Sequence, residues 1–392
     1  MISYYNNNEI RKLIKDNEFL DPFEVSLHLK NHDGGIRKYV SQQILSRNKA
    51  RKKIPEWFTN EEIIFPPPIS VEQASSSIAA RYKAKLIRRG TVLDLTGGMG
   101  VDTYFFSQEA QEVWYVEKDP DLVKIADLNF KKLGCSNINT VCQDSKIFLE
   151  SWSGLVDCIY IDPSRRSGRK KVFKLEDSEP NILDLIDVFH EKAEKTIIKA
   201  APYLDIKYAL RTISRLSEVH VLAIENECKE ILFVLSNSPC STQIITVNIA
   251  GTIVQEYKKI FNEDEETICE FGIEGKFLYD PNVAIRKAGL FNSICSEYKL
   301  KKIAVNSHLY INNNLIDNFP GRIFEIIEIC TFNILIKKYK FKSGNIAIRN
   351  FPASVKEIRE KTGIQEGGDL YIFGTTDSHR NMIFIIGRKI YI

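Results

Sequence analysis

The sequence has little of what marks a secreted, membrane-spanning or metal-binding protein. No stretch reaches the roughly 18 uncharged apolar residues of a membrane helix, and the first residues, MISYYNNNEIRK, lack a signal-peptide core. The eight cysteines include no C-x-x-C pair, and the six histidines are scattered. These absences argue against a disulfide framework and a zinc site. We therefore expect a cytoplasmic protein with no metal and no membrane partner.

The chain also has no large excess of positive or negative charge. The chain has 54 Lys and Arg against 51 Asp and Glu, a net charge of only +3. Any affinity for nucleic acid must therefore come from local clusters of positive charge. The dense clusters lie at residues 47–53, 165–174 and 337–342. We expect substrate affinity to depend on these three clusters and on salt.

At 392 residues the chain is too long for one compact core. Apolar residues at helical spacing between residues 22 and 53 predict a helical unit over residues 1–65. The prolines at 66–68 cannot continue a helix and predict a stiff linker. An α/β domain is expected over residues 66–275, where positions 236–275 add strands or act as a connector. A further small α/β unit begins near residue 279 and divides near residue 320.

Short apolar runs alternate with helical patterns between residues 70 and 235, which predicts a doubly wound parallel sheet. The last two predicted strands are too close for a crossover helix and should pair antiparallel. This is the outline of the seven-stranded, Rossmann-like sheet of class I methyltransferases rather than of a dinucleotide-binding domain. The predicted strands are Thr91–Leu95, Glu112–Val116, Asn139–Cys142, Cys158–Ile161, Thr196–Lys199, Val219–Ile224 and Ile231–Leu235.

A glycine-rich turn, VLDLTGGMGVD at residues 92–102, follows the first of these strands. Glycines allow the backbone to approach a ligand closely. Read as D-x-x-G-G-x-G, the turn resembles motif I of class I methyltransferases, with Thr96 where a glycine often stands. It also fits a degraded dinucleotide fingerprint, G-x-G-x-x-T. The candidate cofactor residues here are Asp94, Thr96, Gly97, Gly98, Gly100 and Asp102.

Acidic residues follow the next two predicted strands. Glu117, followed by Lys118, lies about twenty residues after the glycines, where a carboxylate accepts the ribose hydroxyls of NAD or S-adenosylmethionine. Asp144, followed by Ser145, occupies the position that holds the adenine amino group in methyltransferases; the alternative is a solvated loop acid.

A polar turn lies upstream of the glycines. Residues 75–77, all serine, can cap the helix that follows them. The same position is where motif X closes over the methionine end of the cofactor, which makes Gln73 and Ser75 further candidates. We weigh the two interpretations equally.

The fourth strand ends in DPSRR at residues 162–166, which resembles motif IV of nucleic-acid methyltransferases. There the acid and the turn accept hydrogen bonds from the nucleophilic group, so the candidate catalytic residues are Asp162, Pro163 and Ser164. A serine replaces the second proline, and an arginine occupies the position of the base-stacking aromatic. The cations that follow are either a phosphate clamp or a solvated face. The candidate substrate-binding residues are Arg165, Arg166, Arg169, Lys170 and, after the fifth strand, Tyr203.

With these motifs the chain resembles a bacterial family of class I methyltransferases with a C-terminal THUMP-like domain. The resemblance includes residues 72–73, 80–83, 94–98 and 162–166. It continues in YDPNVAIRKAG at residues 279–289, NSHLY at residues 306–310 and FPGR at residues 319–322. It implies S-adenosyl-L-methionine as cofactor, a ferredoxin-like unit over residues 276–322 and a THUMP-like domain over residues 323–392. THUMP domains bind RNA, which implies a tRNA or rRNA substrate. The C-terminal strings carry no known chemistry.

The motifs favour methylation of an exocyclic base amine. Methylation of a pyrimidine at C5 requires a nucleophilic cysteine. Cys158, Cys228 and Cys240 lie in no matching catalytic motif. Two alternatives remain: a methyltransferase of protein or small molecules, and a non-catalytic RNA-binding protein that keeps the fold.

Overall fold

A computed structural model describes residues 4, 7–165, 175–238, 241–261, 264, 267–340 and 342–391. The chain forms two compact units. The first unit comprises Met1–Leu216 and Leu232–Pro239, and the second comprises Ser217–Ile231 and Cys240–Ile392. Across the described ranges, no helix combines the length and the apolar character needed to cross a bilayer.

The first unit begins with helices that the apolar spacing predicts. Asp21 and Glu24 form a reciprocal capping box at the start of the second helix, which satisfies backbone amides that have no partner within the helix. The first three helices share a small core that includes Ile10, Val25 and Val40. The helices are α1 (Asn8–Asn17), α2 (Pro22–His28), α3 (Gly34–Lys53), α4 (Pro55–Phe58), α5 (Pro68–Gln73) and α6 (Ser77–Ala84).

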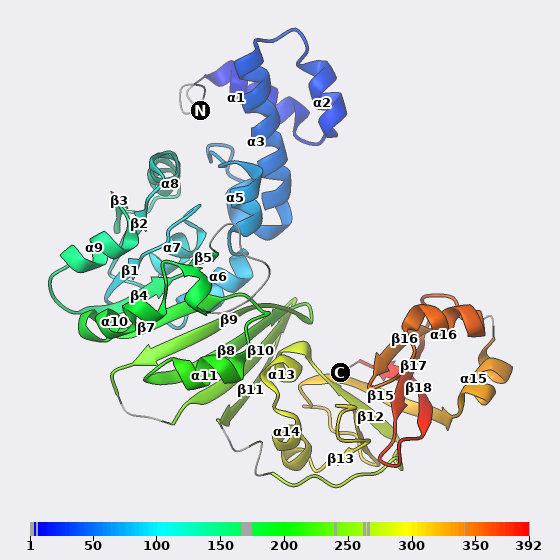
Figure 1. Cartoon of the computed structure of the whole chain (residues 1–392). Helices are drawn as coiled ribbons and strands as arrows, with labels where there is room; N and C mark the ends of the chain where they lie inside the picture. Colours follow the sequence, from blue (N-terminus) through cyan, green and yellow to red (C-terminus); the bar gives the residue numbers. More distant parts are fainter. Residues whose placement is uncertain are drawn as a thin grey trace. The chain divides into compact units, whose positions relative to one another are not determined.

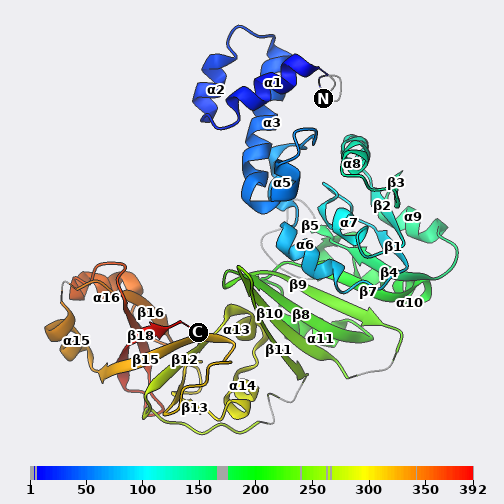
Figure 2. The same ribbon diagram turned by 180° about the vertical axis from the view of Figure 1, so that it is seen from behind.

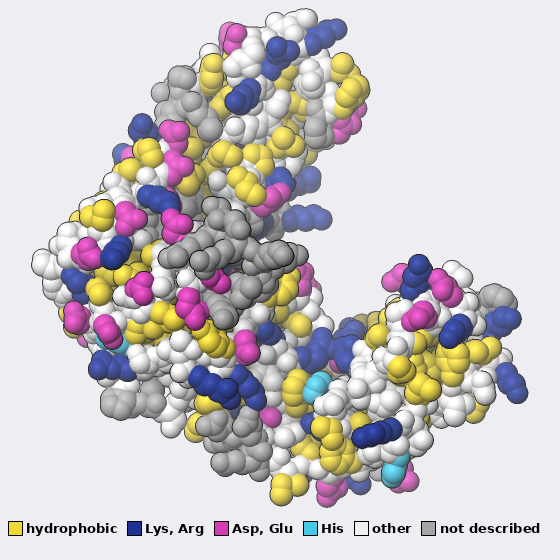
Figure 3. Space-filling view, in the orientation of Figure 1, with side chains coloured by type: hydrophobic (Ala, Val, Ile, Leu, Met, Phe, Trp, Pro, Cys, Tyr) yellow, Lys and Arg dark blue, Asp and Glu magenta, His cyan; other side chains and the backbone are white. Residues whose placement is uncertain are grey.

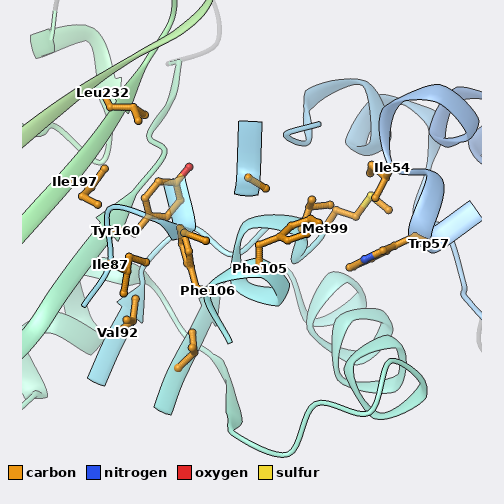
Figure 4. Close-up of a cluster of buried hydrophobic side chains, with 14 of the residues drawn as sticks. Ile54, Trp57, Ile87, Val92, Met99, Phe105, Phe106, Tyr160, Ile197 and Leu232 are labelled. Carbon is orange, nitrogen blue, oxygen red and sulfur yellow. The ribbon is translucent and has the colours of Figure 1, made fainter. Parts of the chain in front are cut away.

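The segment around the three prolines, where we predict a stiff linker, is packed against α3. The Gln43 side chain donates to the Phe65 carbonyl (2.7 Å) and accepts from its amide (3.0 Å), and the Ser46 hydroxyl donates to the Pro66 carbonyl (2.7 Å). Ile54 and Trp57 also join the core beneath the sheet, together with Phe105 and other residues that Figure 4 labels. The N-terminal helices and the sheet therefore share buried side chains.

The main sheet confirms the predicted α/β class and extends it. Its nine strands have the order β11-β10-β8-β9-β7-β4-β1-β2-β3, and β3, β2, β1, β4 and β7 pair in parallel (Figure 1). The strands are β1 (Thr91–Asp94), β2 (Glu112–Glu117), β3 (Ile138–Cys142), β4 (Val156–Ile161), β7 (Ala193–Ala200), β8 (Leu216–Ile224), β9 (Glu227–Ser236), β10 (Gln243–Ala250) and β11 (Ile253–Ile260). The helices are α7 (Val101–Phe106), α8 (Pro120–Lys132), α9 (Ser145–Ser151), α10 (Ile186–Lys192) and α11 (Ile206–Thr212). A short ribbon pairs β5 (Ser164–Arg165) with β6 (Ser178–Glu179).

The predicted hairpin is present, but it lies inside the sheet because β10 and β11 follow β8 toward the edge. Only Glu225 and Asn226 separate the neighbouring strands β8 and β9, and both have positive φ, at 51° and 57°. Two consecutive residues of this kind form the type I′ turn that joins antiparallel strands. The added strands expected after residue 236 are β10, parallel to β8, and β11, antiparallel to β10.

The second unit contains a separate seven-stranded sheet of order β13-β14-β12-β15-β18-β17-β16 (Figure 2). Strand β15 begins at the predicted division near residue 320, but it pairs with β12 on one side and β18 on the other, so both sides of that division share one sheet. The strands are β12 (Phe277–Pro281), β13 (Lys301–Lys302), β14 (Tyr310–Asn312), β15 (Gly321–Cys330), β16 (Asn345–Arg349), β17 (Leu370–Thr376) and β18 (Met382–Ile390). The helices are α13 (Val283–Ala288), α14 (Phe291–Glu297), α15 (Phe332–Tyr339) and α16 (Val355–Thr362).

Candidate active site

The candidate site lies where the parallel strands of the first unit end. Strands β1, β2, β4 and β7 run in the same direction, so their carboxyl ends meet at one edge of the sheet. Asp94, Glu117 and Asp162 lie at or directly after the ends of three of these strands, and Lys199 lies near the end of the fourth. Ligands bind at this edge in open α/β sheets.

The glycine turn after β1 needs its glycines. Gly98 and Gly100 have φ of 53° and 88°, in the left-handed region that side chains disfavour. A Cβ on Gly97 would lie 2.2 Å from the ring of Tyr115. The Tyr115 hydroxyl donates to the Gly98 carbonyl (2.7 Å), and the Gly98 amide donates to Glu117 Oε2 (3.0 Å). The turn and the predicted ribose-binding acid are thus in direct contact.

Asp94 supports this turn from inside the protein. Its carboxyl group accepts from the Thr103 hydroxyl (2.5 Å) and from the Thr96 amide (3.2 Å), and it is buried. Burial raises the pKa of Asp94 to about 7, and the charges of Asp102 and Asp162 act in the same direction. Because Asp94 is buried, we expect it to hold the turn rather than to touch a ligand directly.

Asp102 takes part in a buried polar network that the sequence motifs did not predict. Lys83, which is fully buried, lies 2.9 Å from Asp102 Oδ1. The Ser75 hydroxyl (2.8 Å) and the Tyr160 hydroxyl (2.9 Å) donate to Asp102 Oδ2. Burial opposes ionisation of Asp102, but Lys83 and then Lys199 outweigh it and lower its pKa. Two predicted residues, Ser75 and Asp102, are therefore brought together by a lysine that was missed.

Asp162 is held by two contacts. Its backbone amide donates to Thr96 Oγ1 (2.7 Å), and its Oδ2 accepts from Lys199 Nζ (2.5 Å). The first contact gives the unusual Thr96 a role, because the hydroxyl that replaces a glycine ties the glycine turn after β1 to the turn after β4. The Asp162 side chain remains 36% exposed. Lys199 was not predicted, although its place near the end of β7 is the signal that could have found it.

The remaining predicted residues are more dispersed. Asp144 is exposed and caps α9 by accepting from the Lys146 amide (2.9 Å), while Ser145 is the first residue of that helix. Gln73 is exposed at the end of α5. Lys118 pairs with Glu179 (3.0 Å).

The predicted substrate-binding segment after β4 is described only in part. Pro163 is half-buried, and the exposed Ser164 donates to the Glu179 carbonyl (3.3 Å). Tyr203 is 70% exposed. The Arg165 side chain and the predicted residues Arg166, Arg169 and Lys170 lie outside the described part of the chain.

The dependence of substrate affinity on the cluster at residues 47–53 stays a prediction, but Arg47 is not available to a phosphate. This side chain is buried, pairs with Glu18, and lies 5.2 Å from the centre of the Phe58 ring. Lys49 pairs with Glu72, and Lys53 donates to the Val71 carbonyl (3.1 Å). These cations attach α3 to neighbouring segments. The sequence alone could not show this, because the partners lie 18 to 29 residues away.

Three family models match parts of the chain. "Conserved hypothetical protein 95" matches residues 57–206, "ferredoxin-like domain" matches residues 277–320, and "THUMP domain-like" matches residues 321–389. The first covers the candidate site, and the other two lie in the second unit.

Two relatives and one solved structure match longer parts of the chain than any of these family models. An uncharacterised S-adenosylmethionine-dependent methyltransferase of Mycobacterium tuberculosis is 22% identical over 309 residues, 76% of this chain and 80% of that protein. Ribosomal RNA small subunit methyltransferase J of Francisella philomiragia is 27% identical over 202 residues, 45% of this chain and 82% of that enzyme. A crystal structure of a candidate methyltransferase from Porphyromonas gingivalis W83 covers 98% of both chains, with 27% identity and a TM-score of 0.88.

Proposed function

Because the chain is a class I S-adenosylmethionine-dependent methyltransferase with a C-terminal THUMP-like domain, we propose that it methylates an exocyclic base amine of ribosomal or transfer RNA. The observation that carries the proposal is the partly exposed Asp162 carboxylate, fixed to the glycine turn through Thr96. The similarity to a small-subunit rRNA methyltransferase and the THUMP-like region support RNA as the substrate.

The chain's own residues fit the cofactor. No side chain lies close to the Cβ position of Gly98, so a ligand can approach the backbone there, whereas Gly97 and Gly100 make room for the rings of Tyr115 and Phe130. Both Glu117 oxygens accept backbone amides, from Gly98 and Asp119, yet each oxygen keeps a second lone pair for a ribose hydroxyl. Asp144 would accept from the adenine amine. When bound, S-adenosylmethionine supplies an electrophilic methyl group on a sulfonium.

Asp162 would position the acceptor for in-line attack. Its Oδ2 binds Lys199, so the other oxygen is the one placed to accept a hydrogen from the base amine. That hydrogen bond would orient the amine nitrogen for attack, and the Asp162 carboxylate or solvent would take the amine proton. Catalysis of this kind rests on orientation and on exclusion of water.

The cysteines do not favour a covalent route. Burial raises the pKa of Cys158 to about 12 and that of Cys228 to about 11, so neither forms a thiolate readily near neutral pH. Cys240 lies outside the described residues.

A ribose hydroxyl is a second candidate acceptor, and Lys199 is the observation that favours it. A hydroxyl must lose its proton to attack: the Asp162 carboxylate would take it, and the Lys199 ammonium, 2.5 Å from Asp162, would stabilise the negative charge that develops on the hydroxyl oxygen. Fragmentation of the methylated nucleoside separates the two candidates, because the methyl group leaves either with the base or with the sugar.

The test is methyl transfer from labelled cofactor to RNA isolated from a deletion strain, followed by mass spectrometry of the nucleosides. We expect label in one base-methylated nucleoside, lost on RNase treatment before the reaction and absent with Asp162→Ala. Label in a protein or small-molecule fraction would contradict RNA as substrate. Cofactor binding by calorimetry without any transfer would favour the non-catalytic alternative.

A further inference from the structure

The second unit contains one buried carboxylate surrounded by three arginines. Asp280 is 1% exposed. Its Oδ2 accepts from Arg322 Nε (3.2 Å) and Nη2 (2.5 Å). Its Oδ1 accepts from Arg286 Nη1 (3.2 Å) and Arg349 Nη2 (3.3 Å). We call Arg286, Arg322 and Arg349 the arginine triad.

The triad gathers from elements far apart in the fold. Asp280 faces Arg322 in the register of β12 and β15, and Arg286 lies one helix later in α13. Arg349 ends β16, which β15, β18 and β17 separate from β12 in the sheet order. The sheet must therefore curl for the Arg349 side chain to reach Asp280. Three of these four residues lie in the sequence strings that carry no assigned chemistry.

Holding one carboxylate does not require three guanidinium groups. The two charged N–H bonds of Arg322 already match the usual way an arginine binds a carboxylate. With Asp280 ionised, the cluster carries one negative and three positive charges. Repulsion within such a cluster destabilises it unless another anion is present.

The surroundings show the same excess of positive charge. Burial lowers the pKa of Arg286, and Arg349 and Arg322 lower it further while Asp280 alone raises it. Burial also lowers the pKa of the neighbouring His308 to about 4, assisted by Lys302, Arg286 and Arg349. Arg349 Nε is buried and has no hydrogen-bond partner among the described residues.

The triad remains accessible to a ligand. The side chains of Arg286, Arg322 and Arg349 are 22%, 33% and 23% exposed. Figure 3 shows Lys and Arg side chains beside a His in the area of α13 and β15. The planar guanidinium group of arginine binds phosphate oxygens through paired N–H bonds. A phosphodiester carries one negative charge, which would reduce the excess positive charge of the cluster.

We propose that the arginine triad binds a backbone phosphate of the RNA substrate, with Asp280 holding the three guanidinium groups in place. This inference rests on the proposed function and assigns part of its substrate recognition to the second unit. A phosphate contact positions the RNA without reading its sequence.

The experiment measures binding of a fluorescent, mixed-sequence 20-nucleotide RNA to the full chain over a range of salt. Arg286→Gln and Arg349→Gln each remove one triad charge and leave Arg322 on Asp280. Lys356→Gln is the matched control, because this side chain is 86% exposed and belongs to an i,i+4 pair on α16. We expect each triad variant to bind RNA about five- to tenfold more weakly. The slope of log affinity against log salt should become shallower by about 0.7 for each phosphate that is no longer neutralised, and the control should match wild type.

The binding experiment has four informative outcomes. If folded triad variants bind RNA with the wild-type affinity and slope, this inference is wrong while the proposed function stands. If the wild-type chain binds cofactor but neither binds nor methylates RNA, the proposed function fails as well. If inorganic phosphate binds to the triad at constant ionic strength and RNA does not displace it, the triad takes the free ion instead. If one variant does not fold, judged by its melting curve, the other decides.

Discussion

The two units pair their carboxylates with different numbers of cations. In the first unit, Asp102 is paired with Lys83 and Asp162 with Lys199. In the second unit, Asp280 contacts three arginines. A carboxylate paired with one lysine gives a neutral, preorganised site that needs no further ion. A carboxylate among three guanidinium groups is electrostatically incomplete without an anion. On the proposed function, the first unit would hold the reacting groups with lysine-paired carboxylates, and the second unit would leave positive charge for its ligand to neutralise.

Removing one partner of the neutral pair should have the largest effect. Lys83→Met leaves Asp102 buried without its lysine, so the free energy of unfolding of the first unit should fall by about 3–5 kcal/mol. All three tryptophans, Trp57, Trp114 and Trp152, lie in this unit, so urea denaturation followed by tryptophan fluorescence reports on it. The double variant Lys83→Met/Asp102→Leu should recover most of the loss. An unchanged denaturation midpoint in the single variant would show that the pair is not a structural one.

Asp94 is a further carboxyl group of the first unit, and its negative charge is neutralised by a proton rather than by a lysine. Its pKa rises from 3.8 to about 7 in the folded protein, so the folded state keeps a proton that the unfolded state has lost. Stability from this group is therefore present below pH 3.8 and is lost as pH rises through about 7, by about 4 kcal/mol at most. The measurement is urea denaturation from pH 4 to 8. Asp94→Asn should remove this component of the pH dependence, and equal slopes in both proteins would refute the shift.

Asp162 tests whether the second neutral pair is catalytic. Asp162→Ala should lower the rate of methyl transfer about 100-fold or more, because it removes the group that orients the acceptor. Cofactor affinity and melting temperature should stay near wild type, since the Thr96 contact involves the backbone amide. Single-turnover kinetics with saturating RNA would measure the effect. Full activity would mean that the acceptor is held elsewhere.

Glu117 tests the donor side of the same edge. Glu117→Ala should weaken S-adenosylmethionine binding by roughly 1.5–3 kcal/mol, as for loss of hydrogen bonds to a charged group. Glu109→Ala is the matched control, because it removes an exposed acid before β2 begins, at the opposite edge of the sheet. Calorimetry should show a normal affinity for the control. Equal affinities for the two variants would contradict the assignment of Glu117.

The smallest expected effect concerns the unbalanced carboxylate. Asp280→Asn removes the charge that the arginines share, so the second unit should lose about 1–3 kcal/mol of stability. Phosphate should restore part of this loss by occupying the triad. Hydrogen exchange of backbone amides in β12 and β15 would measure it locally. Asp102→Asn in the first unit should show no such rescue, and a rescue there would remove the contrast between the units.

The sheet and its motifs could be predicted from local sequence. Strand positions follow from short apolar runs, and the glycine turn and Asp162 stand in contiguous motifs. The ion pairs could not be predicted, because Lys199 and Asp162 are 37 residues apart and Arg349 and Asp280 are 69 apart. Arg47 shows the reverse error: a basic residue in a basic run is buried against a distant glutamate. Local patterns predict elements, whereas charge partners depend on how the elements pack.

The hydrogen bond from the Asp162 amide to the Thr96 hydroxyl joins the glycine turn after β1 to the turn after β4. If cofactor and RNA bind at these two turns as proposed, a ligand that tightens one turn restricts the other, and the binding of donor and acceptor is thermodynamically linked. Such coupling is reciprocal: RNA must raise the affinity for S-adenosylmethionine by the same factor by which S-adenosylmethionine raises the affinity for RNA. The product S-adenosylhomocysteine, bound to the same turn, would then delay release of the methylated RNA. One threonine in place of a glycine thus bears on the order in which ligands enter and leave.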